Sequence, residues 1–381
     1  MSKYQPVTKP IPVKVNSKNG GSRPDYIIFM PDQVSMKEDG YHVACLAPRG
    51  DTFAPTVTEL SLNEYGFLET PDYMPGFAGK FGTPTEPKED IWSHCPPDDK
   101  PWVLFLPLVF PHCPFQVEEP YFSMYDRKSM KEVVSRHEHK TGYELKYMKA
   151  NRDRYRTERA TDEIWKEIKA TYYGMITRLD DQFGRLLNKV DELGLWKDTV
   201  TMFFTDHGEY LGDHGMIEKW PSGLGETIVH EPLIIGGAGL PEGNTISAMT
   251  EMVDLVPTVF ELSGIAETFM HNGKSWVPLL IGGETKHKGY AFSEGGFLLS
   301  EEPLLEQAPY PYDIKTALQH EDTTLVGKEI SLRDKDYYYV YRLYEPAELY
   351  DRHKDLPEMH NLAELREYAA IVSKRSSLPT D

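Results

Sequence analysis

The chain has 381 residues, of which 40% are hydrophobic, enough for one large α/β domain with an appendage or for two domains. Asp and Glu number 60 against 41 Lys and Arg, so the formal net charge is −19. A surface this acidic repels nucleic acid and anionic membranes and argues against both as partners. The three cysteines, Cys45, Cys95 and Cys113, are too few and too oddly spaced for a disulfide framework or a cysteine zinc site.

Residues 1–24 are polar, rich in Lys and Pro, and contain no acidic residue, so they are interpreted as a flexible tail. This stretch has no apolar core of the kind found in secretory signals. No apolar run in the chain is long enough to span a bilayer. We therefore expect a cytoplasmic protein in a reducing compartment.

Short apolar runs that suit buried strands recur along the chain, and most end at polar or glycine-rich residues. They are residues 26–30, 40–47, 102–110, 199–204 and 231–237. Between the second and third runs, residues 50–100 are rich in Gly, Pro and acidic residues, which predicts a long loop with little regular structure.

The clearest helical pattern runs from Ile164 to Leu193, with apolar residues at steps of three and four and Gly194 able to end the helix. Residues 252–265 indicate a second amphipathic helix with a proline in its early turns. Strands that alternate with helices predict an α/β fold with a mostly parallel sheet covered on both faces.

The character of the sequence changes after about residue 285. Residues 335–344 are aromatic and polar and suit an antiparallel strand, and residues 347–364 are expected to end in a short helix. We therefore predict a main domain over residues 25–285 and a smaller C-terminal α+β subdomain over residues 286–381.

Polar clusters follow three of the predicted strands: Asp32-Gln33, His112 and Asp206-His207. Ligands of open α/β sheets bind at the carboxyl ends of the strands, where these side chains would converge. Carboxylates, an amide oxygen and an imidazole suit Ca²⁺, Mg²⁺ or Mn²⁺, and the imidazole leaves Zn²⁺ possible. A single Asp at a strand end is also a common turn former or helix cap, so spacing alone leaves both interpretations open.

The stretch "FFTDHGEYLGDHGMIEKW", residues 203–220, strengthens the metal interpretation. It holds two acid–histidine pairs, Asp206-His207 and Asp213-His214, among glycines that permit sharp turns. Lys219 follows, and a lysine beside a metal site is a natural partner for a tetrahedral anion. The alternative is a solvated polar loop, and His214 in particular is interpreted as structural.

Several segments, in order, resemble the sulfatase family of the alkaline-phosphatase superfamily. The resemblance begins at Arg23 and covers most of the chain. Its segments are "RPDYIIFMPDQ", "PWVLFLPLVFPHCPF", the long block "TYYGMITRLDDQFGRLLNKVDELGLWKDTVTMFFTDHGEYLGDHGMIEKW", "EPLIIGG", "MVDLVPTVFELSGI" and "AELYDRHKDLPEMHNLAE". The Pro-Asp-Gln opening is similar to the branch that contains phosphonate monoester and phosphodiester hydrolases.

The resemblance implies an alkaline-phosphatase-like sheet flanked by helices and a metal-dependent hydrolysis of sulfate esters. It assigns one divalent metal ion, Ca²⁺ first with Mn²⁺, Mg²⁺ or Zn²⁺ as alternatives, to Asp32, Gln33, Asp206 and His207. His112 and Lys219 would bind the sulfuryl or phosphoryl oxygens and take part in catalysis. The partner implied is a small-molecule sulfate or phosphate ester.

Cys45-Leu46-Ala47-Pro48-Arg49 matches the Cys-x-Pro/Ala-x-Arg motif of the family, in which the cysteine is oxidised to formylglycine and its hydrate attacks the ester. In relatives this motif opens a helix far downstream of the first metal aspartate. Here Cys45 comes thirteen positions after Asp32, no Leu-Thr-Gly follows, and the surrounding run indicates a strand. The simpler interpretation is that the segment with the usual nucleophile is missing after Gln33 and that Cys45 matches by accident.

Three hypotheses follow from these observations. The first is a sulfatase that uses Cys45 as its modified nucleophile. The second is a phosphonate monoester or phosphodiester hydrolase on the same metal site. The third is a catalytically impaired relative that keeps the fold and binds a metal or an anion without turnover.

Overall fold

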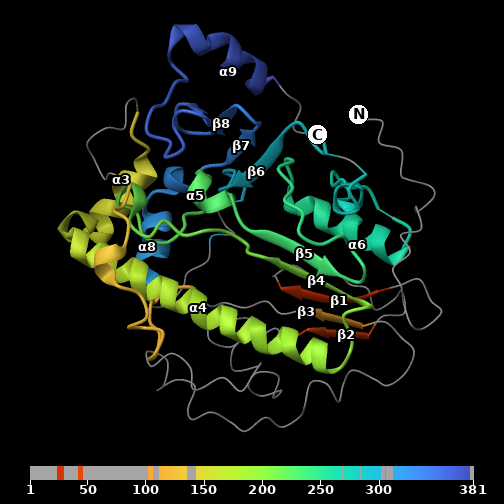
Figure 1. The fold of residues 1–381 in the computed structure, drawn as a ribbon. Coiled ribbons are helices and arrows are strands. Elements are labelled where there is room, and N and C mark those ends of the chain that lie inside the picture. Colours follow the sequence, from red (N-terminus) through yellow and green to blue (C-terminus); the bar gives the residue numbers. More distant parts are fainter. Residues whose placement is uncertain are drawn as a thin grey trace.

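A computed structural model gives the fold of the protein (Figure 1). It describes the following residues: 24–29, 42–45, 102–105, 111–134, 143–267, 269–283, 285–301, 305 and 312–377. The predicted tail, most of the predicted loop over residues 50–100, and the predicted ligands Asp32 and Gln33 lie outside these residues.

The main sheet has five strands in the order β2-β3-β1-β4-β5. The first four are parallel, and β5 runs antiparallel to β4 at one edge. Their bounds are β1 Asp25–Phe29, β2 His42–Cys45, β3 Trp102–Phe105, β4 Thr199–Phe204 and β5 Leu233–Gly237. All five predicted strands are therefore confirmed, and the α/β class with a mostly parallel sheet is confirmed with them.

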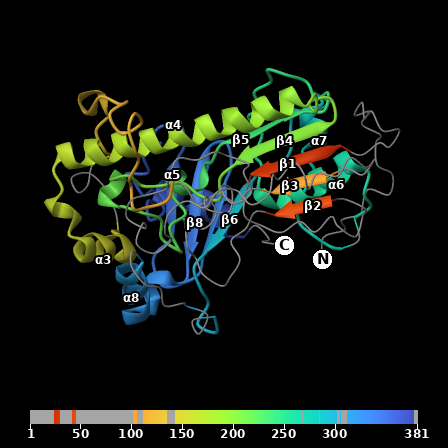
Figure 2. The ribbon, with the colours of Figure 1, turned by 90° about the horizontal axis from the view of Figure 1, so that it is seen from below.

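Helix α4, Asp162–Glu192, runs along one face of this sheet (Figures 1 and 2). It begins where the Thr161 side chain accepts a hydrogen bond from the backbone N–H of Ile164, and Gly194 follows its end with a φ of 66°. The rings of Phe183 and Phe203 meet edge to face at 5.0 Å and join α4 to β4. The longest predicted helix is thus confirmed.

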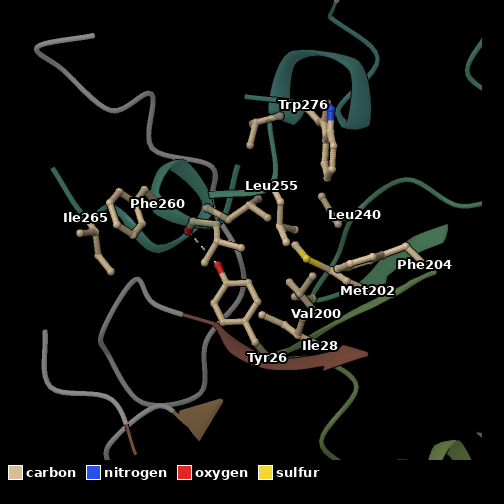
Figure 3. Close-up of a cluster of buried hydrophobic side chains, with 14 of the residues drawn as sticks. Tyr26, Ile28, Val200, Met202, Phe204, Leu240, Leu255, Phe260, Ile265 and Trp276 are labelled. Atoms are coloured by element: carbon tan, nitrogen blue, oxygen red, sulfur yellow. Dashed lines mark hydrogen bonds between the residues drawn. The ribbon is translucent and has the colours of Figure 1, made fainter. Parts of the chain in front are cut away.

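Alternate side chains of β1 and β4 point to the opposite face, where Tyr26, Ile28, Val200, Met202 and Phe204 are buried. They pack against α6, Leu255–Ser263, and α7, Val277–Leu280 (Figure 3). The buried phenol of Tyr26 donates to Val259 O at 3.2 Å and lies 2.8 Å from Ser263 Oγ. The second predicted helix is confirmed as a 3-10 turn, Met252–Asp254, that continues into α6.

The segment that follows His112 packs along α4, which fixes where that histidine lies. Phe115 meets Tyr172 edge to face at 5.7 Å, and Glu118 accepts a 2.7 Å hydrogen bond from the buried Arg178. Gly174 lets the two backbones touch, because a Cβ there would lie 2.5 Å from Tyr121 O.

A second sheet of four antiparallel strands, in the order β6-β7-β8-β9, forms the C-terminal part of the fold. Its strands are β6 Ala291–Gly295, β7 Glu329–Arg333, β8 Tyr337–Arg342 and β9 Glu348–Asp351. Strand β8 confirms the antiparallel strand expected within residues 335–344. The boundary proposed at residues 285 and 286 stays a prediction.

The remaining helices are short and surround the two sheets. The α-helices are α3 Lys146–Tyr155, α5 Glu226–Val229, α8 Asp313–Glu321 and α9 Ala369–Ser376. Single 3-10 turns cover Arg127–Ser129, Thr157–Arg159, Asp213–Gly215, Thr323–Val326 and Arg366–Tyr368. Among the helices that the structure describes, none combines the length and the apolar character needed to cross a bilayer.

Buried arginines attach the second sheet to the loop that follows β4. Arg333 donates to Glu226 Oε2 at 3.0 Å and to Leu224 O at 2.8 Å. Trp220, which is buried, donates its indole N–H to Leu325 O at 2.7 Å. The C-terminal part therefore contacts the segment of residues 220–226, which directly follows the predicted Lys219.

Replacing Gly174 with Ala should destabilise the protein by about 1–3 kcal/mol, because the new methyl group would overpack against Tyr121 O and Val117. Gly184→Ala on the same helix is the matched control. A Cβ at Gly184 meets nothing within 4 Å, so this change should stabilise by about 0.5–1 kcal/mol. Urea denaturation of the two variants measures the difference, and equal effects would contradict the described contact of α4.

Candidate active site

The carboxyl ends of β1, β3 and β4 lie at one edge of the main sheet. In register, Ile28 pairs with Phe105 and Phe29 pairs with Phe203. The chain therefore leaves β1 and β4 side by side, and Asp206 follows β4 by two residues. Its predicted partners Asp32 and Gln33 belong to the chain after β1 but lie outside the described residues.

Asp206 and His207 are held together by local contacts at this edge. The Asp206 side chain is 53% exposed, and its Oδ1 accepts the backbone N–H of His207 at 3.0 Å. Nε2 of the His207 ring lies 3.5 Å from Asp206 Oδ2, and Nδ1 of the same ring lies 2.9 Å from Gly208 O. Burial lowers the pKa of His207, although the Asp206 carboxylate opposes this. A neutral imidazole is the form that ligates a metal.

Gly208 fixes the path of the loop that carries this pair. Its N–H donates to Ile228 O at 2.8 Å, and a Cβ at this position would clash with Thr227 O. Only glycine allows the backbone to pass this close to α5. The loop therefore packs against α5, the helix whose Glu226 also accepts a hydrogen bond from Arg333 of the second sheet.

His112 and Lys219, which are 107 residues apart in the chain, are in direct contact through Nε2 and Nζ. Burial, followed by the nearby charge of Lys219, lowers the pKa of His112 to about 3. The imidazole is therefore neutral near pH 7. Its Nδ1 lies 3.0 Å from Cys113 O and donates to that carbonyl, which leaves Nε2 to accept from the Lys219 ammonium.

Burial also lowers the pKa of Lys219. Nearby groups that favour the ammonium form oppose this shift, with the Cys113 sulfur first and the Asp206 carboxylate next. The influence of Asp206 on Lys219, and of His207 on His112, connects the two predicted pairs electrostatically. The structure thus brings His112 and Lys219 together at the edge where Asp206 and His207 lie.

Four residues that the sequence did not single out complete this cluster. Cys113 donates its thiol to Glu218 Oε1 at 3.1 Å, and Glu218 is buried with a φ of 63°. The Tyr312 ring lies edge-on to His112 at 5.3 Å, with its hydroxyl 3.3 Å from His112 Nδ1. Lys315 Nζ lies 3.9 Å from Glu218 Oε2.

The sequence gave an indication of two of these four residues, because Cys113 directly follows the predicted His112 and Glu218 directly precedes the predicted Lys219. Tyr312 and Lys315 gave none, because about two hundred positions separate them from His112 and only the fold brings them near.

The second acid–histidine pair has a different environment. Asp213 contacts Lys169 Nζ at 3.3 Å and accepts the backbone N–H of Val134 at 2.9 Å. His214 is buried, and its ring lies edge-on to Tyr210. These contacts fit the structural role expected of His214.

Cys45 is the last residue of β2, the strand at the far edge of the sheet. It pairs with Phe105, which in turn pairs with Ile28. Ile28 pairs with Met202, so the Cys45 backbone lies at the same level of the sheet as Met202. Met202 comes four positions before Asp206 in the chain. Three strand spacings of about 4.8 Å add about 14 Å of lateral separation between β2 and β4. The strand expected around Cys45 is confirmed, and its place weighs against a role beside Asp206.

Within the described part of the chain, no group of three or more His, Cys, Asp or Glu side chains could hold a metal. That part contains two of the four predicted ligands, Asp206 and His207. An exposed carboxylate beside a neutral imidazole, just after the carboxyl end of β4, fits part of an oxygen-rich divalent site. The metal and its full ligand set stay predictions.

The arrangement of the main sheet is that of the alkaline-phosphatase superfamily. Residues 95–265 match the family model described as Sulfatase. The chain belongs to the sulfatase family.

Two curated relatives and one solved structure illustrate the likeness. The multifunctional alkaline phosphatase superfamily protein PehA of Trinickia caryophylli is 30% identical over 296 residues, which cover 72% of this chain and 54% of PehA. A sulfatase of Formosa agariphila is 28% identical over 302 residues, or 71% of this chain and 59% of that protein. The phosphonate monoester hydrolase of Agrobacterium radiobacter superposes with a TM-score of 0.59 at 26% identity, covering 74% of this chain and 56% of the other. The chain thus spans little more than half the length of these relatives.

Lys219→Met should raise the pKa of His112 from about 3, because it removes the nearby positive charge. The pKa should stay below 6.5, since burial remains and is the larger cause. Lys169→Met is the control, because Lys169 pairs with Asp213 instead. Histidine ring NMR across a pH titration follows the change, and an unmoved His112 would rule out the contact with Lys219.

Proposed function

We propose that this protein carries out metal-dependent hydrolysis of sulfate esters, with a divalent ion, Ca²⁺ first, on Asp32, Gln33, Asp206 and His207. The observation that carries the proposal is the contact between Lys219 and a neutral His112. A partly buried ammonium whose contact is an uncharged imidazole favours an incoming anion.

The two side chains have complementary tasks in this proposal. Lys219 donates to a non-bridging oxygen of the ester and offsets the charge that develops there. The negative charge of a bound ester counteracts the effect of Lys219 and raises the pKa of His112. His112 then holds the proton that the departing alcohol oxygen requires. The metal, when bound to these residues, would act as a Lewis acid and would lower the pKa of the water or hydroxyl group that attacks the ester.

Hydrolysis of phosphonate monoesters or phosphodiesters is the second candidate. Two observations favour it: the Pro-Asp-Gln sequence that ends at Gln33, and the likeness to a phosphonate monoester hydrolase structure at 26% identity. The same lysine and histidine serve either ester, since both transferred groups are tetrahedral and anionic.

His112→Ala and Lys219→Ala should each lower kcat/KM by about 10²–10³-fold, the usual cost of removing one group that stabilises transition-state charge. Lys169→Met is the control, because Lys169 contacts Asp213 and neither His112 nor Lys219. This variant should keep kcat/KM within about threefold of the unmodified protein. Turnover of an aryl sulfate, an aryl phosphonate monoester and a diaryl phosphate, before and after chelation, measures these effects. Higher kcat/KM on the phosphorus esters would select the second candidate, and turnover that survives chelation would exclude the metal.

We expect the peptide that contains Cys45 to have the mass of unmodified cysteine, because β2 lies three strands from β4. Turnover should then be low and unchanged in Cys45→Ala. Mass spectrometry of the digested protein, with rates of the variant, checks both points. A mass deficit that matches formylglycine, together with lost turnover in Cys45→Ala, would establish Cys45 as the nucleophile.

A further inference from the structure

A groove lies between the segment that follows His112 and the first half of α4. Its volume is about 490 Å³, which is in the range of pockets that bind small molecules. In Figures 1 and 2 the segment of residues 111–134 crosses the first half of α4 on the side to which β1 and β3 point. The groove therefore lies toward the same edge of the main sheet as the candidate active site.

The lining of the groove is mainly apolar. Four of its seven residues have apolar side chains, namely Phe115, Val117, Phe122 and Ile168. Phe115 and Val117 pack against the buried Met175 of α4, which fixes the inner side of the groove. Phe122 is 40% exposed, so its ring offers apolar surface that a bound group can cover.

The charged side chain in the described lining is already neutralised. Glu167 accepts two hydrogen bonds from Arg127, one from Nε at 3.0 Å and one from Nη2 at 2.9 Å. The Arg127 guanidinium also lies over the Phe122 ring, 4.5 Å from the ring centre. A neutral ligand group therefore fits this lining better than a charged one, because a charged group would find no opposite charge among the described lining residues.

Both walls of the groove are connected to the anion-binding pair. Phe115 comes three residues after His112, so the two Cα atoms are at most about 11 Å apart. On the other wall, Lys169 of α4 contacts Asp213 at 3.3 Å. Asp213 belongs to the loop of residues 206–219, which ends at the lysine of the pair. The groove is therefore placed beside the position where an ester would bind.

We propose that this groove binds the alcohol half of the ester, and that this alcohol is large, neutral and apolar, such as a fused-ring aromatic alcohol. A sulfate ester of such an alcohol carries its one negative charge at the end that Lys219 contacts, and the groove covers the uncharged end. The proposal rests on the proposed function, because it takes His112 and Lys219 as the place where the anionic group binds. It adds the class of alcohol and the residues that select it, Phe115 and Phe122 first.

A sugar or another hydroxyl-rich alcohol is the competing occupant. Such a group needs several hydrogen-bond partners when it is removed from water. Both carboxylate oxygens of Glu167 already accept from Arg127, and Thr171 is buried. Gln116 is left as the accessible polar side chain of the described lining, which is too little for a ring with several hydroxyl groups.

The test compares naphthalenesulfonate with methanesulfonate by calorimetric titration at pH 7. Each carries one negative charge on a tetrahedral sulfur group, and neither is an ester, so hydrolysis cannot interfere. Naphthalenesulfonate should bind about tenfold or more tightly, because the groove removes its rings from water. Phe122→Ala should weaken naphthalenesulfonate by about fivefold or more, while methanesulfonate changes by less than about twofold.

Phe269→Ala is the matched control for the loss of an exposed phenyl ring. Phe269 is 53% exposed, and its ring packs on Phe260 of α6 instead. This variant should change neither affinity. Equal affinities of the two sulfonates for the unmodified protein, or equal losses in Phe122→Ala and Phe269→Ala, would overturn the proposal.

Gln116→Trp gives a second measurement if Phe122→Ala fails to fold, because the larger side chain would fill the groove. It should weaken naphthalenesulfonate and spare methanesulfonate, and an unchanged ratio of the two affinities would refute the groove as the binding site. Lys219→Met should weaken both sulfonates. Naphthalenesulfonate binding that does not depend on Lys219 would separate the groove from the anion-binding pair and also overturn the proposal.

These readouts do not depend on turnover, so the two proposals can fail separately. A preference for naphthalenesulfonate that requires both Phe122 and Lys219, without hydrolysis of any ester, would refute the proposed function and support the groove. Hydrolysis that depends on Lys219, together with equal binding of the two sulfonates, would support the proposed function and refute the groove.

Discussion

The contact between the Lys219 ammonium and the neutral His112 ring is the interaction on which the site depends. It joins two segments 107 residues apart, one after β3 and one after β4. The contact is possible because burial and the lysine charge keep the imidazole unprotonated, with a pKa of about 3. Without a bound anion, a protonated imidazole would repel Lys219, and the contact between the two segments would be lost.

Most of the fold outside the main sheet supports the two ends of that contact. The segment after His112 is fixed by α4 through Gly174, where the backbones touch. The loop around Lys219 is fixed from the other side, by Trp220 on Leu325 O and by Arg333 on Glu226. These anchors come from the C-terminal part, so removing it would loosen the loop that carries Lys219, even though Lys219 precedes it in the chain.

Local periodicity predicted what depends on local sequence, such as α4 and β4, whose patterns extend over whole elements. The direction of β5 was not predictable, since an apolar run does not specify the orientation of its partner. Helix α3 was missed because its buried side includes Asn151 and Arg152, which hide the helical period. The prediction of a short helix at the end of residues 347–364 was wrong. The Asn361 side chain accepts hydrogen bonds from the N–H groups of Leu349 and Ala363 and stabilises a turn there instead.

The site could likewise be predicted only in part, because a motif indicates residue types but not the distances between elements that are far apart in the sequence. His112 was predictable because it follows a predicted strand, and Lys219 because the stretch of residues 203–220 resembles the sulfatase family. Lys315 belongs to a different part of the fold and brings charge that no local pattern reveals. Cys45 is the converse case, since its short motif matches while the register of β2 places its backbone about 14 Å to the side of β4. In the proposed function, binding of an anion and chemical attack on it would therefore be separable. The first depends on residues that the fold brings together, and the second requires a group that β2 does not bring to the same edge position.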